Sequence, residues 1–233
     1  MASGDTDDRF SNVQSSNGKG NGLLLYCYHY SFYSQKVLMA LHEKKLDFKS
    51  HIVMIKKGEQ YQPWFLQINP RGEVPVLKDG VKIIPDSSRI IDYLDDNFSN
   101  GNSHRLIPLD QGPEVKQKVL YFRNILDQLP AGVITMGSFY NPEFCQNPKP
   151  PFIKPVRKML MVADQNSAKS LRGHAERNTE HKEILLQKAE FQEIKHKTVT
   201  SKTEYSKVLE QVDKVLSEVE AELLSHEAGK DIF

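Results

Sequence analysis

The sequence predicts an α/β domain followed by an all-α domain, and three observations support this fold class. Residues 23–97 alternate short strand-like and helix-like segments that turn residues separate. All twelve prolines lie between Pro63 and Pro155, and residues 174–228 contain neither Gly nor Pro, which leaves helix almost unopposed there. Apolar residues of the second half recur at steps of three and four, the spacing of one helix face.

The first domain is predicted to combine a parallel strand pair with a hairpin. Its predicted elements, in order, are strand 23–28, helix 33–45, strand 48–55, short helix 60–67, strand 73–78, strand 81–84 and helix 87–97. Asp79-Gly80, between the last two strands, is a strong two-residue hairpin signal. A βαβ unit followed by ββα is the order of a thioredoxin-like fold, so we expect that arrangement in residues 23–102.

The second domain, residues 103–233, is predicted to be helical around two apolar stripes. The first stripe ends near Pro130 and consists of Val115, Val119, Phe122, Leu126 and Leu129. The second consists of Tyr205, Val208, Val212, Val215, Val219 and Leu223. We interpret the second stripe as a core-packing face rather than a coiled-coil seam, because its alternation lasts only about two heptads. Residues 141–155 are predicted to form a proline-rich loop.

Two segments are polar enough to be predicted outside the packed core. Residues 1–22 are expected to be a disordered tail, and residues 164–204 a charged helical insertion. The apolar residues of the insertion look too scattered for one stripe; they are Ala168, Leu171, Ile184, Leu185, Phe191 and Ile194. We therefore expect helix that forms but fluctuates against the body, and we expect this segment to bind protein partners.

Composition excludes several classes of protein. Lys plus Arg is 31 and Asp plus Glu is 30, so a net charge of +1 gives no general attraction to nucleic acid. No apolar run approaches the length of about 18 residues that spans a membrane. The two cysteines, Cys27 and Cys145, form no CxxC pair, and the histidines show no HExxH spacing, so we expect no disulfide and no metal. Cys27 alternates with tyrosines in a strand and is predicted to be a small buried side chain.

Four motifs, in order and at consistent spacing, resemble the glutathione transferases and, more closely, the ganglioside-induced differentiation-associated proteins. They are SFYSQKV, QPWFLQINPRGEVPVL, SSRIIDYLDDNF and KVLEQVDKVLSEVEAEL, and the resemblance runs from about Leu23 to Leu224. It implies a glutathione transferase-like fold and a regulator of mitochondrial morphology with weak or no glutathione conjugation. The alternative is an active transferase that conjugates small electrophiles.

The same resemblance carries expectations about location and partners. Full-length relatives continue to a C-terminal anchor in the mitochondrial outer membrane, with the protein on the cytosolic face. Because this chain stops at EAGKDIF, we expect an incomplete helical half, a truncated form or fragment, and a cytoplasmic location without the anchor. Glutathione, small electrophiles, protein partners and a second copy in a homodimer are the partners that the resemblance allows.

The proline of GEVPVL is the first candidate element of a glutathione site. A proline cannot donate to a sheet ladder, so Pro75 should lie at an edge or a bulge. The resemblance implies a cis Val74–Pro75 bond and a Val74 backbone that pairs with the cysteinyl residue of glutathione, as in β-augmentation. The alternative is that Pro75 only ends strand pairing and protects an edge.

Two helix starts are the other candidates. Ser31 matches the position that serine-type transferases use to stabilise the glutathione thiolate, and Tyr26 matches the tyrosine-type position, with Tyr33 and Ser34 near enough to substitute. Asp86 and Ser87 stand at a helix N-terminus suited to the γ-glutamyl carboxylate, although Asp86 is one methylene shorter than the family's Glu or Gln. Both starts also suit plain N-capping. Lys57, with Lys56 and Gln60 nearby, is the candidate cation for the glycyl carboxylate, and a solvated loop is the alternative.

Overall fold

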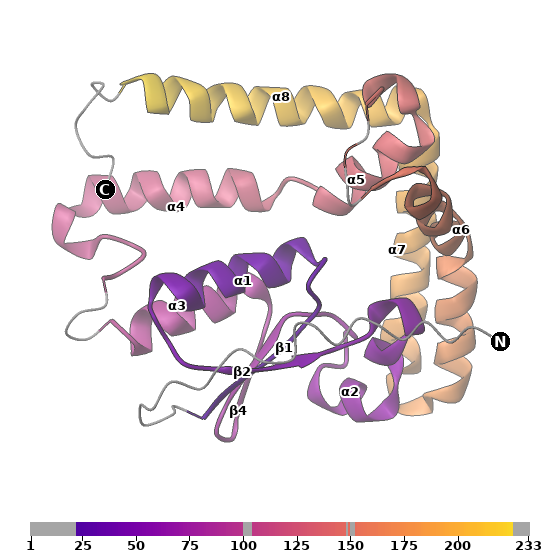
Figure 1. The fold of residues 1–233 in the computed structure, drawn as a ribbon, viewed down its shortest axis with the longest axis horizontal. Coiled ribbons are helices and arrows are strands. Elements are labelled where there is room, and N and C mark those ends of the chain that lie inside the picture. The colour runs from indigo at the N-terminus through magenta and orange to yellow at the C-terminus, as the bar shows by residue number, and fades with distance from the viewer. Residues whose placement is uncertain (1–21, 100–103, 148, 150–151, 226–233) are drawn as a thin grey trace. The chain divides into compact units, whose positions relative to one another are not determined.

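The computed structural model describes residues 22–99, 104–147, 149 and 152–225 (Figure 1). It separates into two compact units, Met1–Leu106 and Ile107–Phe233. The predicted tail falls, except for Gly22, outside the described residues, as does the predicted domain boundary at residue 102.

Unit 1 is a four-stranded sheet with helices on both faces, which confirms the thioredoxin-like prediction. Its strands lie in the order β2-β1-β3-β4, with β1 parallel to β2 and antiparallel to β3. The strands are β1 (Leu23–Cys27), β2 (Lys49–Ile52), β3 (Val76–Asp79) and β4 (Lys82–Pro85). The helices are α1 (Phe32–Glu43), α2 (Pro63–Ile68) and α3 (Ser87–Asn97), with 3-10 turns at Ile55–Lys57 and Glu59–Tyr61.

Side-chain alternation along β1 divides the apolar core of unit 1 into two clusters. Leu23, Leu25 and Cys27 pack with buried residues of α1 and α3, whereas Tyr26 packs with Phe65 of α2 on the other face. Cys27 is buried, as predicted, and burial raises the pKa of its thiol to about 11. Cys27 is therefore a core side chain and not a nucleophile.

A buried ion pair fastens the end of unit 1 to this core. Lys44 Nζ lies 3.0 Å from Asp95 Oδ1, and neither side chain is more than 2% exposed. Lys44 also donates to Ser99 Oγ at 2.7 Å and to the His104 carbonyl at 3.0 Å, while the Leu106 amide donates to Asp95 Oδ1 at 2.6 Å. These bonds hold the chain on both sides of residues 100–103 against α1 and α3.

Unit 2 contains only helices within the described residues. They are α4 (Pro113–Asp127), α5 (Ala131–Tyr140), α6 (Lys154–Arg177), α7 (Lys182–Thr200) and α8 (Lys202–Ser225), with 3-10 turns at Leu109–Gln111, Pro142–Phe144 and Thr179–His181. The sequence predicted α4 and α8 from their stripes but not α5. The α5 sequence, AGVITMGSFY, is apolar almost all round and includes two glycines, so it shows no helical periodicity.

The prediction that residues 164–204 lack a common apolar face is wrong. The charged segment forms α7 and most of α6, and the two helices pack against each other. The side chains that pack there are buried; they are Leu171 and Ala175 of α6 and Leu185 and Ala189 of α7. The prediction undervalued alanine, which completes an apolar face and lets two helices approach closely. Phe191 and Ile194 remain exposed on α7.

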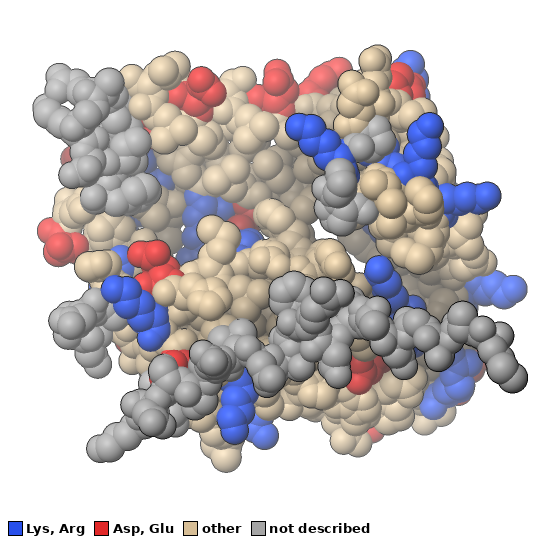
Figure 2. Space-filling model, in the orientation of Figure 1, with Lys and Arg blue, Asp and Glu red and all other residues tan. Residues whose placement is uncertain are grey.

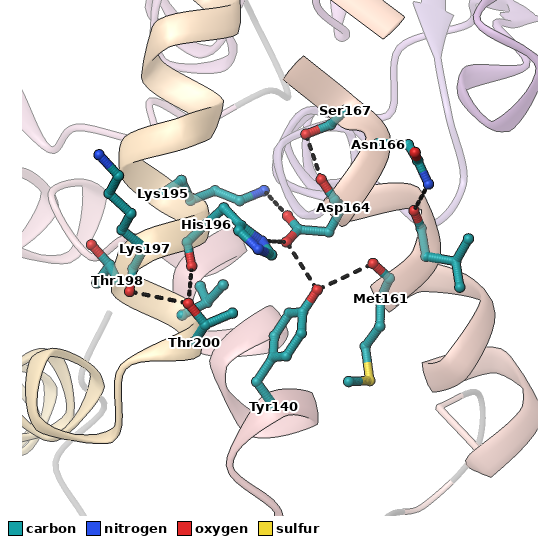
Figure 3. Close-up of polar contacts among 12 residues, drawn as sticks. Tyr140, Met161, Asp164, Asn166, Ser167, Lys195, His196, Lys197, Thr198 and Thr200 are labelled. Atoms are coloured by element: carbon teal, nitrogen blue, oxygen red, sulfur yellow. Dashed lines mark hydrogen bonds and ion pairs between the residues drawn. The ribbon is translucent and has the colours of Figure 1, made fainter. Parts of the chain in front are cut away.

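A polar cluster joins α5, α6 and α7 around one buried carboxylate (Figure 3). Asp164 Oδ2 lies 2.7 Å from His196 Nδ1 and accepts from the Tyr140 hydroxyl at 3.3 Å, and Asp164 Oδ1 lies 3.1 Å from Lys195 Nζ. Burial, together with the Asp164 charge, raises the pKa of Tyr140 to about 12, so this phenol keeps its proton at neutral pH. The insertion is thus joined to α5 by polar bonds as well as by apolar packing.

One tyrosine anchors α8, whose stripe is otherwise less buried than predicted. The Tyr205 ring is buried against Gly137 of α5, where an added Cβ would come within 2.0 Å of it, and its hydroxyl donates to the Ile134 carbonyl at 2.9 Å. The four valines of the stripe are only half-buried, and Leu223 is exposed. No side chain of α4 is buried either, although Lys118 and Tyr121 of α4 bond to glutamates of α8.

Two negative findings hold for the described residues. None of their helices combines the length and the apolar content needed to cross a membrane. No group of three or more His, Cys, Asp or Glu side chains among them could hold a metal ion.

Candidate functional site

The sheet register gathers four chain segments at one end of unit 1. Val76, the first residue of β3, pairs with Tyr26 near the end of β1 and with Pro85 at the end of β4. On the other side of β1, Cys27 pairs with Ile52 at the end of β2. The segments that follow β1, β2 and β4 therefore leave the sheet at the same edge where the chain enters β3. These segments carry all the predicted site residues except Tyr26, which lies within β1.

The entry into β3 has the predicted backbone geometry. The Val74–Pro75 peptide bond is cis, and the ladder to β1 begins only at Val76, so the backbone of Val74 lies beyond the sheet pairing. The preceding loop is held by a residue that sequence reasoning missed. The Asn69 side chain is buried, donates to the Glu73 carbonyl at 2.8 Å and accepts from the Arg71 amide at 3.2 Å. Asn-Pro before a strand signals such a turn, and the INP sequence could have indicated it.

Ser31 occupies the N-cap of α1, at the end of the short connection from β1. Its Oγ accepts from the Ser34 amide at 3.3 Å, and its own amide donates to the Tyr28 carbonyl at 2.9 Å. The side chain is half-buried, and Tyr30, Phe32 and Tyr33 around it are exposed. Ser31 therefore keeps a hydroxyl proton that could be donated outward.

Tyr26, the alternative thiolate donor, lies in a different environment. Its ring packs among His51, Trp64 and Phe65, with centroid distances of 5.5, 6.3 and 6.1 Å, and it is almost fully buried. Tyr26 thus belongs to the α2 side of the core, whereas Ser31 begins the helix on the opposite face.

The start of α3 combines an internal cap with a serine that is almost fully buried. Asp86 Oδ1 accepts from the amides of Ser88 at 2.9 Å and Arg89 at 3.2 Å, so Asp86 is an N-cap. Asp86 has φ +76°, a conformation that costs a non-glycine residue on the order of 1–3 kcal/mol and is often found at functional sites. Ser87 is 4% exposed, and we find no hydrogen bond to its hydroxyl from any described residue.

The residues after β2 provide two exposed lysines and one buried amide side chain. Lys57 is exposed, and Lys56 lies over the Tyr30 ring at 5.5 Å. Gln60 is buried, and its Oε1 has no hydrogen-bond partner among the described residues. Unsatisfied buried polar atoms are rare in folded proteins, so Gln60 is a better candidate for ligand contact than its neighbourhood alone suggested.

Comparison with known proteins establishes the family. Residues 25–103 match the model of the glutathione S-transferase N-terminal domain. A zeta-class glutathione S-transferase from Euphorbia esula is 32% identical over 168 residues, which cover 70% of this chain and 70% of that protein. The chain belongs to the glutathione S-transferase family. Its predicted fold class is therefore confirmed together with the observed sheet.

Two further comparisons concern a curated relative that matches over only part of its length and a solved structure with a similar fold. Human ganglioside-induced differentiation-associated protein 1-like 1 is 36% identical over 121 residues, 52% of this chain and 33% of that protein. The chain thus matches about a third of the length of that relative. The crystal structure of the beta-etherase LigF from Sphingobium is 23% identical, with a TM-score of 0.58 over 85% of this chain and 72% of that one. At this identity the likeness concerns the transferase fold alone.

Proposed function

We propose that this glutathione S-transferase family member binds glutathione at the edge where β3 begins. The observation that carries the proposal is the cis Val74–Pro75 bond beyond the sheet ladder, at the same end as the starts of α1 and α3. Backbone groups that lie outside the ladder in this way can capture an extended peptide through main-chain hydrogen bonds. Val74 would pair with the cysteinyl residue, and Pro75 would hold Val74 in place.

The α3 N-terminus would bind the γ-glutamyl end. The Ser87 hydroxyl, to which no described residue bonds, supports this assignment, since a ligand carboxylate would give it a partner. Asp86 opposes tight binding, because its carboxylate already accepts two amides of the same helix start and adds a negative charge there. We therefore expect weak glutathione binding, with a Kd no tighter than about millimolar, or roughly −4 kcal/mol.

Ser31 rather than Tyr26 would stabilise the glutathione thiolate. The Ser31 hydroxyl stands at the N-terminus of α1, whose dipole favours a negative charge nearby. The Tyr26 ring is enclosed by the aromatic side chains of the α2 face. For the glycyl end we keep Lys57 as the cation. We also keep Gln60, whose carbonyl oxygen has no partner among the described residues and would accept a hydrogen bond from the amide N–H of the glycyl residue.

Two proposals remain for the cellular role of glutathione binding by this chain. The match to ganglioside-induced differentiation-associated relatives supports a regulator of mitochondrial morphology, with protein partners, a homodimer and outer-membrane location in the full-length form. We assign partner binding to the α6–α7 segment, where Phe191 and Ile194 are exposed. The zeta-class relative supports the alternative, an active transferase that conjugates small electrophiles.

Calorimetric titration with glutathione tests the site, with Ser87→Ala as the variant and Ser170→Ala, on the exposed face of α6, as the matched control. Ser87→Ala should weaken binding by about 1–3 kcal/mol, because it removes a hydrogen bond to a charged group. The control should bind as the unaltered chain does. Equal affinity in all three proteins would remove Ser87 from the site.

A separate activity assay distinguishes the two proposed roles. Turnover of a small aromatic electrophile in the presence of glutathione would favour the transferase over the regulator.

A further inference from the structure

The first turn of α1 contains a second serine whose hydroxyl faces inward. Ser34 is 0% exposed, although serine is ordinarily a surface residue in helices. Its Oγ accepts from the Tyr28 amide at 3.3 Å, six residues back and before the helix begins. A buried hydroxyl that reaches back across a turn fixes the path of the chain between the two residues.

Three hydrogen bonds close this turn around Ser31. The Ser31 amide donates to the Tyr28 carbonyl at 2.9 Å, the Ser34 amide donates to Ser31 Oγ at 3.3 Å, and the Tyr28 amide donates to Ser34 Oγ. Ser34 thus contacts both ends of the segment, Tyr28 through its side chain and Ser31 through its backbone. A separate bond, from Gln35 Nε2 to the His29 carbonyl at 2.5 Å, lies on the exposed side of the same turn.

This arrangement determines what the Ser31 hydroxyl can do. An amide that donates to Ser31 Oγ occupies a lone pair, so the hydroxyl proton is left for another acceptor. A hydroxyl that accepts one hydrogen bond is also a stronger donor in the next. If the Ser34 hydroxyl is lost, its hydrogen bond from the Tyr28 amide is lost as well, and the segment that orients Ser31 can relax.

We propose that Ser34 is a positioning residue that acts through Ser31. Its hydroxyl fixes Tyr28, and this fixes the direction in which Ser31 donates to the sulfur of bound glutathione. The inference rests on the proposed glutathione site and adds a residue to its thiolate-stabilising part. Ser34 itself touches neither the sulfur nor the rest of the ligand.

The test measures the thiol pKa of bound glutathione from the ultraviolet absorbance of the thiolate, together with its Kd. Ser34→Ala should raise that pKa, so that the thiolate fraction near neutral pH falls by up to about tenfold, while Kd changes by less than about twofold. Ser31→Ala should raise the thiol pKa of bound glutathione at least as far. The double variant should have the same thiol pKa as Ser31→Ala alone. Such non-additivity is the expected result when one residue acts only through another.

Two further variants make the result decisive. Gln35→Ala removes the exposed tie to His29 and should leave the thiol pKa unchanged, whereas an equal rise would overturn a specific role for Ser34. Ser34→Cys supplies a weaker acceptor, so its thiol pKa should lie between that of the unaltered chain and that of Ser34→Ala. It replaces Ser34→Ala if the alanine variant does not fold. If the unaltered chain lowers the thiol pKa and removal of the Ser34 hydroxyl does not reverse it, this inference alone fails. If the unaltered chain binds no glutathione, the proposed function fails and the inference with it.

Discussion

At the scale of single residues, Asp86 combines two effects of opposite sign. Its carboxylate caps α3, while its φ of +76° strains any residue with a side chain. Asp86→Gly loses the cap but relieves the backbone, and Asp86→Ala loses the cap and keeps the strain. We therefore expect Asp86→Ala to unfold more easily than Asp86→Gly by about 1–2 kcal/mol, measured by urea titration. Equal stability of the two variants would show that the backbone relaxes when the side chain changes.

Tyr93 gives a prediction for alkaline pH. Its hydroxyl donates to Asp79 Oδ2 at 2.7 Å, and this hydrogen bond, with smaller effects of burial and of the Asp79 charge, raises its pKa from 10.0 to about 12. Below pH 10 both folded and unfolded chains keep the proton, so the contribution to stability is complete. Between pH 10 and 12 the unfolded chain ionises first, and the contribution is lost. Stability should fall less steeply over this range in Tyr93→Phe, and Tyr30→Phe, at an exposed tyrosine, serves as the control.

At the scale of elements, the contact between α6 and α7 depends on small side chains. Ala175 is fully buried on α6, and Ala163 is exposed on the same helix, so the two positions form a matched pair. Ala175→Leu should destabilise the chain by about 1–3 kcal/mol through overpacking, while Ala163→Leu should change little. Thermal unfolding of both variants measures the difference. A neutral Ala175→Leu would show that α6 and α7 are not closely packed at this position, and it would favour the fluctuating insertion expected from the sequence.

The same elements show what a sequence can and cannot predict. In unit 1, turn residues and alternation predicted every strand, and α3 was predicted at residues 87–97, where it is found. The cis proline and the helix starts came from motif resemblance, because their geometry depends on local sequence. Asn69 and Ser34 act through bonds across a turn, and the Asp164 cluster joins residues up to 56 positions apart in Tyr140 and His196. The Asp164 cluster depends on tertiary packing, and no local pattern indicates it, whereas the INP sequence could have indicated the Asn69 turn.

The buried Lys44–Asp95 ion pair connects α1 and α3 with the end of unit 1. Lys44→Met removes the buried cation of this pair and leaves Asp95 paired with Arg105, whose Nε lies 3.7 Å from Asp95 Oδ2. Loss of one partner of a buried pair typically costs up to about 3–5 kcal/mol. It also removes the donors to Ser99 and to the His104 carbonyl, so the end of unit 1 should loosen. We expect faster proteolysis near residue 104 in Lys44→Met than in Lys45→Met, its neighbour in the sequence. Unchanged proteolysis would mean that Asp95 and Arg105 suffice.

At the scale of the whole molecule, we expect α8 to govern solution behaviour, because its apolar stripe and the leucines beside it stay partly uncovered. Leu216, Leu223 and Leu224 are 51%, 49% and 76% exposed, and the four valines of the stripe are only half-buried. Figure 2 shows acidic side chains gathered along this helix, so charge repulsion opposes the apolar attraction. We expect concentration-dependent self-association that strengthens with added salt, measured by sedimentation. Leu216→Lys should weaken it, whereas Val81→Lys, at a 97% exposed turn position of unit 1, should not. A chain that stays monomeric at high concentration and high salt would show that the stripe is covered within a single molecule.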